Sequence, residues 1–119
     1  MTARQRVRHE LKCWPEFFQP TLNGLKRFDL RRDDRPEGFQ VGDELLLKEF
    51  DPKVLQENLP QEHRTAEDME LAYQKAYTGR EVLVRVDYVM PAKTADRLMG
   101  VLVRTGAPGF VIMSISLVN

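Results

Sequence analysis

The alternation of apolar and polar residues along the chain predicts a mostly β protein. The clearest strand is Glu81–Met90, where Val82, Val84 and Val86 alternate with more polar neighbours. The other expected strands are Arg6–Lys12, Lys26–Arg31, Glu44–Phe50, Val101–Arg104 and Phe110–Leu117, the last two forming a closing hairpin around a Gly/Pro-rich turn. We therefore expect an α+β, mostly β fold: a small mixed β-barrel of six strands with an early helix and a helical insertion.

The early helix is predicted to open at Pro15, because proline suits the first helical position and Glu16 favours the positive N-terminal end. Pro20 predicts a short or kinked helix, and Asn23-Gly24 predicts its end. Its apolar side chains, which we expect to dock on the sheet, are Trp14, Phe17, Phe18, Leu22 and Leu25.

The segment from Asp51 to Tyr77 breaks the β pattern. Its first part is polar and interrupted by Pro52 and Pro60. Thr65 and Asp68 then have the spacing of a capping box, which predicts a helix with a narrow apolar stripe of Met69, Ala72, Tyr73 and Ala76. We expect a loosely held lid or partner-facing flap, which could be deleted over residues 52–76 without unfolding the barrel. A turn is predicted at Tyr77–Arg80 and a helical turn at Pro91–Leu98.

Composition and charge limit the classes of function. The 119 residues form one expected domain, 1–119, with 51–78 as an acidic helical insertion. Net charge is zero, but residues 1–35, 36–70 and 71–119 carry +4, −7 and +3. A general nucleic-acid coating needs an overall basic surface, so any RNA contact must be local. No apolar run has the length of a membrane span, and we expect a cytoplasmic protein without a membrane partner.

Candidate chemistry gathers between Gly24 and Arg35, where five cations and three anions fall within twelve residues. Alternation predicts Lys26, Phe28 and Leu30 on the inner face of a strand, with Arg27, Asp29 and Arg31 on the outer face. Such a cluster suits an anion or a planar polar ring. The alternative is a solvated hairpin with weak surface ion pairs.

Other reactive groups have simpler interpretations. His9 lies between Val7 and Leu11 on one strand face, so we expect it to be partly buried and structural. Cys13 is expected to be a small buried hydrophobe. The sequence has no phosphate loop, no nucleophile in a known motif and no metal-ligand spacing, and it predicts no cofactor and no metal site.

Four segments together resemble the ASCH domain of the PUA-like superfamily, close to a branch of small bacterial and phage proteins of unassigned function. They span residues 9–50 and most of 77–117. The segments are His9–Lys12 with the Trp14-Pro15-x-x-Phe18 helix, Gly24-x-Lys26-x-Phe28-Asp29-x-Arg31-x-x-Asp34-Arg35, Phe39-x-Val41-Gly42-Asp43, and Tyr77–Gly79 with Gly109–Ile112.

The resemblance implies a compact PUA-like barrel with a cleft between the early helix and the Gly-x-Lys strand, where RNA or nucleotides bind. One bacterial ASCH type is an amidohydrolase acting on N4-acetylcytidine. Its catalytic lysine would correspond to Lys26 and its arginine to Arg31, whereas Asp29 stands in place of its threonine nucleophile. Its glutamate has no counterpart in residues 91–100, which contain Asp96. A carboxylate cannot form the alkoxide, but it can act as a base or accept hydrogen bonds.

Three hypotheses follow. The first is a module that binds RNA, a nucleotide, a nucleoside or a modified base through Lys12, Lys26, Asp29, Arg31 and Arg35. The second is an amidohydrolase for acylated cytidine with Lys26 and Asp29 as catalytic residues. The third is a protein-interaction module, phage-encoded, whose acidic insertion meets a basic partner.

Overall fold

The computed structural model describes residues 5–32, 34–59, 62, 65–90 and 110–118. These residues form an α+β, mostly β fold whose elements are β1 Arg8–Cys13, α1 Pro15–Leu22, β2 Phe28–Arg32, β3 Glu44–Phe50, α2 Pro52–Asn58, α3 Ala66–Ala76, β4 Tyr77–Met90 and β5 Phe110–Leu117. The strand predicted at 101–104 and the helical turn predicted at 91–98 lie outside the described residues.

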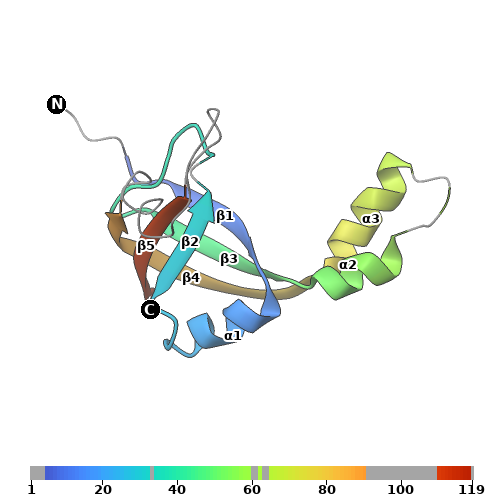
Figure 1. Ribbon diagram of the computed structural model, residues 1–119, viewed down its shortest axis with the longest axis horizontal. Coiled ribbons are helices and arrows are strands. Elements are labelled where there is room, and N and C mark those ends of the chain that lie inside the picture. Colours follow the sequence, from blue (N-terminus) through green and yellow to red (C-terminus); the bar gives the residue numbers. More distant parts are fainter. Residues whose placement is uncertain (1–4, 33, 60–61, 63–64, 91–109, 119) are drawn as a thin grey trace.

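All five strands belong to one mixed sheet in the order β1-β3-β4-β5-β2. β1 runs parallel to β3, and the other three pairs are antiparallel. The sheet curls into a half-barrel with α1 below one end (Figure 1). The expected barrel is present as a half-barrel in the described chain, where β1 and β2 are the two edge strands and no ladder joins them.

Alternating side chains fill the concave side of the half-barrel. Phe18 of α1 is fully buried and belongs to one core cluster with inward-facing residues of four strands. The core consists of Leu11, Cys13, Phe18, Phe39, Leu45, Leu47, Val82, Val84, Val86, Val111, Met113 and Ile115. The boundaries of β3 and β5 agree with the sequence prediction, and buried residues alternate with less buried ones along the first six positions of each strand.

Two arginines cross the gap between β1 and β2, which we call the seam. Arg31 Nη1 donates to the carbonyl oxygen of Lys12 at 2.9 Å, and Arg35 Nη2 donates to that of Glu10 at 3.0 Å. Edge strands leave backbone acceptors without a ladder partner. Here side-chain donors from β2 and the loop after it satisfy two of them.

The face prediction for β2 is wrong. Asp29 is buried and Arg31 is half-buried, while Phe28 and Leu30 are exposed. The register with β5 explains the reversal, because Asp29 pairs with Met113 and Arg31 with Val111, whose side chains point into the core. Paired residues of antiparallel strands share a face, so the two charged residues point inward.

Helix α1 is short, as predicted, and ends before Gly24, whose φ of +76° favours glycine. The prediction that its whole apolar side docks on the sheet is wrong. Only Phe18 and Thr21 are buried in α1. The exposed apolar residues around it are Trp14, Phe17, Leu22 and Leu25.

The insertion forms a helical hairpin, α2 and α3, that projects from the sheet (Figure 1). The capping box at Thr65 and Asp68 is present, as predicted. The interpretation of Pro52 as a helix breaker is wrong, because it occupies the first turn of α2 and the Asp51 side chain caps that helix. The expected turn at 77–80 is instead the start of β4, with Gly79 at φ +91° and a register shift opposite Lys48–Phe50.

The buried carboxylate of Asp43 connects the start of β1 to the loop before β3. The oxygens of Asp43 accept hydrogen bonds from the backbone N–H of Val7 at 3.1 Å and of Gln40 at 3.0 Å. His9 Nε2 lies 3.0 Å from Asp43 Oδ2, and the other ring nitrogen is 3.5 Å from Glu37 Oε1. His9 is thus fully buried rather than partly buried, and its contacts tie β1 to the loop before β3.

Among the described residues, no helix combines the length and the apolar character needed to cross a membrane.

We predict that Asp43→Ala lowers the free energy of unfolding by roughly 3 kcal/mol or more, because each buried donor left without an acceptor costs about 1–3 kcal/mol. Urea denaturation measures the loss. Asp51→Ala is the matched control, since it removes only the cap of α2 and should cost about 1 kcal/mol. Equal losses for the two variants would contradict the role assigned to Asp43.

We predict that replacing residues 52–76 by a short glycine linker leaves the sheet folded. The ends of the insertion meet, since the N–H of Asp51 donates to the carbonyl of Ala76 at 2.8 Å and Phe50 pairs with Tyr77. Hydrogen exchange checks the result: amides of α3 should exchange much faster than those of β4 in the intact chain. An unfolded deletion variant, or equal protection of α3 and β4, would show that the hairpin is part of the core.

Candidate functional site

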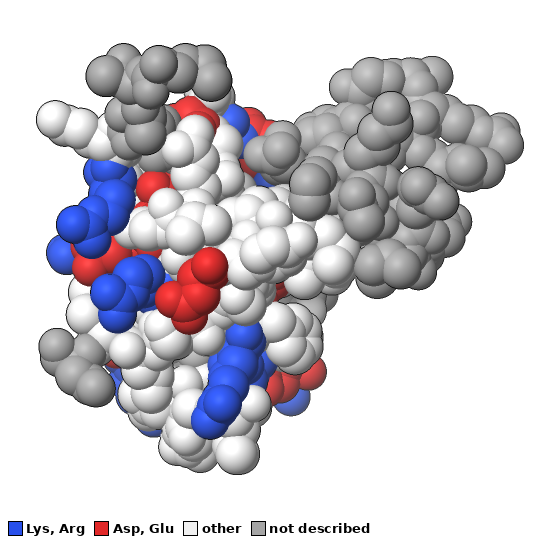
Figure 2. Space-filling view, turned by 90° about the vertical axis from the view of Figure 1, so that its left-hand side faces the viewer, with Lys and Arg blue, Asp and Glu red and all other residues white. Residues whose placement is uncertain are grey.

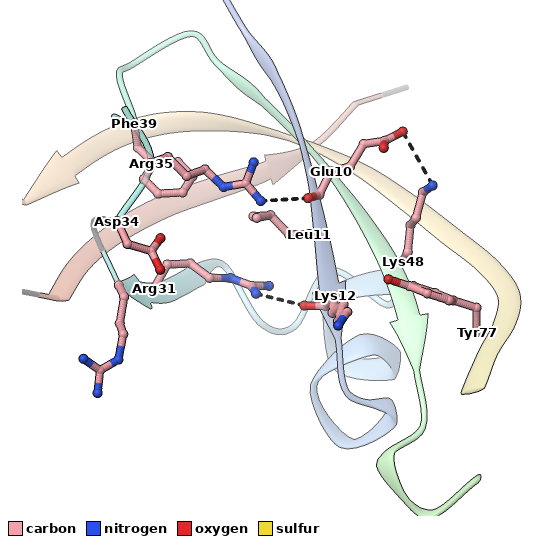
Figure 3. Close-up of a pocket in the computed structure, with 10 residues that line it drawn as sticks. Glu10, Leu11, Lys12, Arg31, Asp34, Arg35, Phe39, Lys48 and Tyr77 are labelled. Carbon is pink, nitrogen blue, oxygen red and sulfur yellow. Dashed lines mark hydrogen bonds and ion pairs between the residues drawn. The ribbon is translucent and has the colours of Figure 1, made fainter. Parts of the chain in front are cut away.

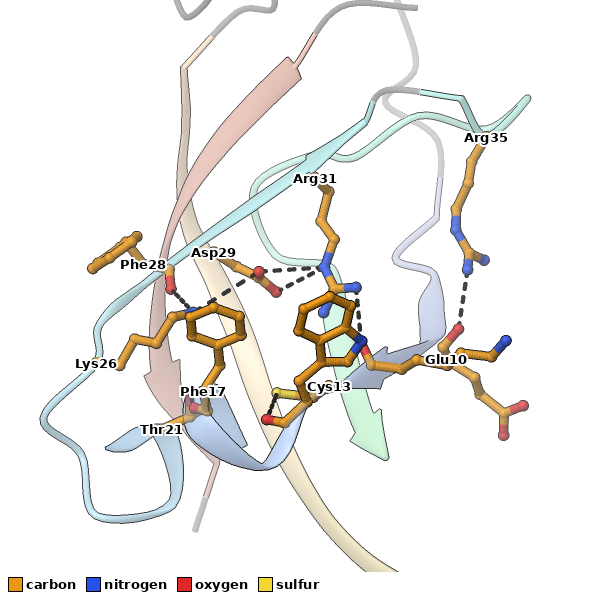
Figure 4. Close-up of polar contacts among 11 residues, drawn as sticks. Glu10, Cys13, Phe17, Thr21, Lys26, Phe28, Asp29, Arg31 and Arg35 are labelled. Atoms are coloured by element: carbon orange, nitrogen blue, oxygen red, sulfur yellow. Dashed lines mark hydrogen bonds and ion pairs between the residues drawn. The ribbon is translucent and has the colours of Figure 1, made fainter. Parts of the chain in front are cut away.

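Three of the residues singled out in the sequence meet beside the seam. Asp29 accepts hydrogen bonds from Arg31 Nε at 3.2 and 3.3 Å, and Lys26 Nζ lies 4.0 Å from Asp29 Oδ1 (Figure 4). Lys26 Nζ also donates to the carbonyl of Phe28 at 2.7 Å. Asp29 is only 5% exposed, and a buried charge is stable only when it is paired. The two cations therefore hold this carboxylate in its position.

Aromatic side chains border this ion cluster. The pocket, which we call the aromatic pocket, has a volume of about 430 Å³ and is lined by Lys12, Cys13, Trp14, Phe17, Lys26, Phe28, Asp29, Leu30 and Arg31. Lys26 Nζ lies 4.9 Å from the ring centre of Phe28 and 5.8 Å from that of Phe17. The rings of Trp14 and Phe17 are nearly parallel, with centres 6.4 Å apart. Because β2 is an edge strand, side chains from both of its faces reach the pocket.

A second hollow lies across the seam, and we call it the basic groove (Figure 3). Its volume is about 460 Å³, and it is lined by Glu10, Leu11, Lys12, Arg31, Arg32, Asp34, Arg35, Phe39, Lys48 and Tyr77. Five of these side chains are cationic and two are carboxylates. Lys12 and Arg31 line both hollows, so the aromatic pocket and the basic groove are neighbours.

The five residues predicted for the site do not all meet in one pocket. Lys26, Asp29 and Arg31 lie together in the aromatic pocket. The carbonyl of Lys12 binds Arg31, while Lys12 Nζ lies over the rings of Phe50 and Tyr73, 4.8 and 4.5 Å from their centres. Arg35 belongs to the basic groove alone.

Sequence reasoning missed the aromatic wall and half of the groove. The apolar pattern predicts Trp14, Phe17 and Phe28 as core residues, whereas they line the pocket. Lys48, which lines the groove, is absent from the predicted site. The signal for Lys48 was present, because it occupies an outward position between the buried Leu47 and Glu49 in β3. No comparable signal separated the exposed rings from Phe18, since only packing decides which of the neighbouring aromatics is buried.

A separate network braces α1 against the sheet. Glu49 accepts hydrogen bonds from the Thr78 hydroxyl at 2.7 Å and from Arg80 Nε at 3.1 Å, and Arg80 Nη2 donates to Gln19 of α1 at 2.9 Å. Burial raises the pKa of Glu49, but the hydrogen bonds from Arg80 and Thr78 and the charge of Arg80 together hold that pKa below its ordinary value of 4.5. This network therefore keeps its charge at neutral pH and fixes the helix that carries the aromatic wall.

No group of three or more His, Cys, Asp or Glu residues in the described part of the chain is arranged to hold a metal ion. His9 lines neither hollow, and its contacts are those of a structural residue.

The fold and site define a small mostly-β domain with a polar and aromatic pocket between its first helix and an open sheet edge. A family model described as a domain of unknown function, DUF3850, matches residues 8–103, and the protein belongs to this family. A search of curated proteins finds no match to the sequence.

We predict that Cys13, the single cysteine, reacts at least about tenfold more slowly with iodoacetamide at pH 7.5 in the native protein than in urea. Burial, which outweighs the nearby Arg31 guanidinium, raises the pKa of the thiol above 9.0, so thiolate forms only in more alkaline solution. Mass spectrometry of the alkylated chain gives the rates. Equal rates in the two states would show that the floor of the aromatic pocket is open to solvent.

Proposed function

We propose that this protein is a PUA-like domain of the ASCH type that binds RNA, a nucleotide or a modified base in its aromatic pocket without converting it. The proposal depends on one observation: the buried carboxylate of Asp29 lies between Arg31 and Lys26 at the wall of a pocket with exposed aromatic rings. We expect a bacterial or phage protein that acts in the cytoplasm.

The carboxylate retains capacity to bind a ligand. An ionised carboxylate has about four lone-pair sites for hydrogen bonds. Arg31 Nε donates to both oxygens of Asp29, and the remaining sites can accept donors from a ligand. The contact to Lys26 is long, at 4.0 Å. Asp29 can therefore accept N–H groups from the edge of a base, while Arg31 and Lys26 donate to carbonyl or ring nitrogen atoms.

The rings around the pocket supply the second half of base recognition. Trp14 is 49% exposed and Phe28 is 55% exposed, although large apolar groups usually gain free energy by burial. Every base has a flat face that can stack on such rings, at a gain of about 1–3 kcal/mol for each stacked base. Stacking combined with edge hydrogen bonds is the usual mode of single-stranded RNA recognition.

Charge on the surface supports a local site rather than a broad nucleic-acid coating. On the face shown in Figure 2, basic and acidic side chains are interspersed and separated by uncharged surface. The chain as a whole has zero net charge. Binding must then depend on short-range contacts within the hollows.

Amidohydrolysis of an acylated cytidine is the second candidate, and the approach of Lys26 to Asp29 favours it. Asp29 would take a proton from water while Lys26 polarised the amide carbonyl. We favour binding, because Asp29 stands where the amidohydrolase that the sequence resembles has its threonine nucleophile, and a carboxylate cannot form the alkoxide.

We predict that nucleosides and their 5′-monophosphates quench the fluorescence of Trp14, the only tryptophan. Asp29→Asn should weaken binding about 10- to 100-fold, because a good bidentate base contact is worth about 1–3 kcal/mol. Phe28→Ala should weaken it similarly through lost stacking. Tyr88→Ala is the matched control, since Tyr88 is 57% exposed and lines neither hollow.

The titration includes the four ribonucleosides, N4-acetylcytidine and a short RNA. Absence of quenching by all of them at millimolar concentration would overturn the proposal. N4-acetylcytidine should be recovered unchanged by chromatography, and release of cytidine that is lost in Asp29→Asn would replace binding by the amidohydrolase function.

A further inference from the structure

Arg32, Arg35 and Lys48 of the basic groove have no role in base recognition, yet they concentrate charge beside the aromatic pocket. The cations of the groove are Lys12, Arg31, Arg32, Arg35 and Lys48, against the carboxylates of Glu10 and Asp34. The surrounding protein is neutral overall, so this excess of positive charge is local. A hollow of about 460 Å³ has the size of a small-molecule site.

The arginines of the groove are positioned before any ligand arrives. Arg35 makes one hydrogen bond to the described chain, through Nη2 to the carbonyl of Glu10, and Arg31 reaches the carbonyl of Lys12 through Nη1. A guanidinium has five N–H donors, so each retains donors after these contacts. The bonds to β1 fix both side chains across the seam, which reduces the entropy lost when they bind an anion.

The one ion pair within the groove is weak enough to open. Lys48 Nζ lies 3.5 Å from Glu10 Oε1, and the two side chains are 33% and 64% exposed. Exposed pairs of this kind are screened by water and salt. Lys48 can therefore turn to an anion without leaving a buried charge unpaired.

We propose that the basic groove binds the phosphate groups of the same ligand whose base lies in the aromatic pocket. This inference rests on the proposed function for the position of the base. Arg31 and Lys12 line both hollows, so the sugar lies beside them and the phosphates extend toward Arg35 and Lys48. Planar guanidinium groups and the Lys48 ammonium match phosphate oxygens in geometry and charge. The ligand is then a nucleotide or an RNA strand, and a free nucleoside occupies only half of the site.

Titration of Trp14 fluorescence with a nucleoside and its 5′-mono- and 5′-diphosphate tests the proposal. At low salt each nucleotide should bind about tenfold more tightly than the nucleoside or better, because a hydrogen bond to a charged group is worth about one decade in affinity. Salt should reduce this advantage without changing nucleoside binding. Equal affinity of nucleoside and nucleotides would overturn the inference and leave the proposed function standing.

Two variants test whether side chains of the basic groove cause the preference for nucleotides. Arg35→Ala and Lys48→Ala should each remove most of the preference for nucleotides and leave nucleoside affinity within about twofold, since neither residue lines the aromatic pocket. Lys48→Ala also tests the proposal if loss of the Arg35 bond to β1 unfolds the chain. Arg85→Ala is the matched control, because Arg85 is exposed on β4 and lines neither hollow. A preference unchanged in both groove variants would overturn the inference.

Calorimetry with inorganic pyrophosphate tests the groove without a base. Pyrophosphate binding that is lost in Arg35→Ala supports the groove as a phosphate site. This result supports the groove even if no nucleoside quenches Trp14, which would reject the aromatic pocket as a base site. A trinucleotide that binds more tightly than the monophosphates, with a salt slope about one unit smaller in Lys48→Ala, identifies the RNA backbone as the phosphate source. Equal affinities identify a mononucleotide. No pyrophosphate binding combined with no nucleotide preference overturns the inference.

Discussion

The open seam between β1 and β2 is the constraint on which this structure depends. A sheet that curls into a half-barrel without closing leaves two edges facing each other, and backbone carbonyls at such an edge need donors. Arg31 and Arg35 supply them from the opposite side of the gap. Backbone pairing would have closed this region as ordinary core, whereas long side chains keep the two edges apart and leave hollows between them.

Arg31 connects this constraint to the chemistry of the site. One guanidinium satisfies the Lys12 carbonyl and neutralises Asp29, so the edge of the sheet and the buried carboxylate are stabilised by the same group. A hydrophobic residue at position 29 would pack against Met113 with no such requirement. The charged pair therefore costs stability that a simpler core would retain, which is the common pattern at binding sites.

The sequence predicted those parts of the fold that local patterns determine. An apolar run located β3, alternation located β5, and the spacing of Thr65 and Asp68 located the start of α3. Pro52 is ambiguous in the sequence because proline favours both the first turn of a helix and its interruption, and the cap at Asp51 decides between them. Gly79 was similarly ambiguous between a turn and a bulge.

The sequence indicates which residues belong to the site but not the direction in which their side chains point. Clustering in the chain indicated Lys26, Asp29 and Arg31, yet alternation alone cannot say which face of β2 meets the core. That choice depends on pairing with β5, which is distant in sequence. The aromatic wall was hidden for a related reason, since Phe17 and Phe18 are neighbours of the same type and only one faces the sheet.

The position of β2 at the end of the strand order also determines when this part of the sheet can form. Its only strand neighbour is β5, the last strand of the described chain, so contacts that place Asp29 and Arg31 form between residues far apart in sequence. Such long-range pairings are slow to form, and during synthesis they must wait until β5 leaves the ribosome. Until β5 is available, a folding chain lacks the strand that positions Asp29 and Arg31, so the ion cluster exists only in molecules whose sheet is complete.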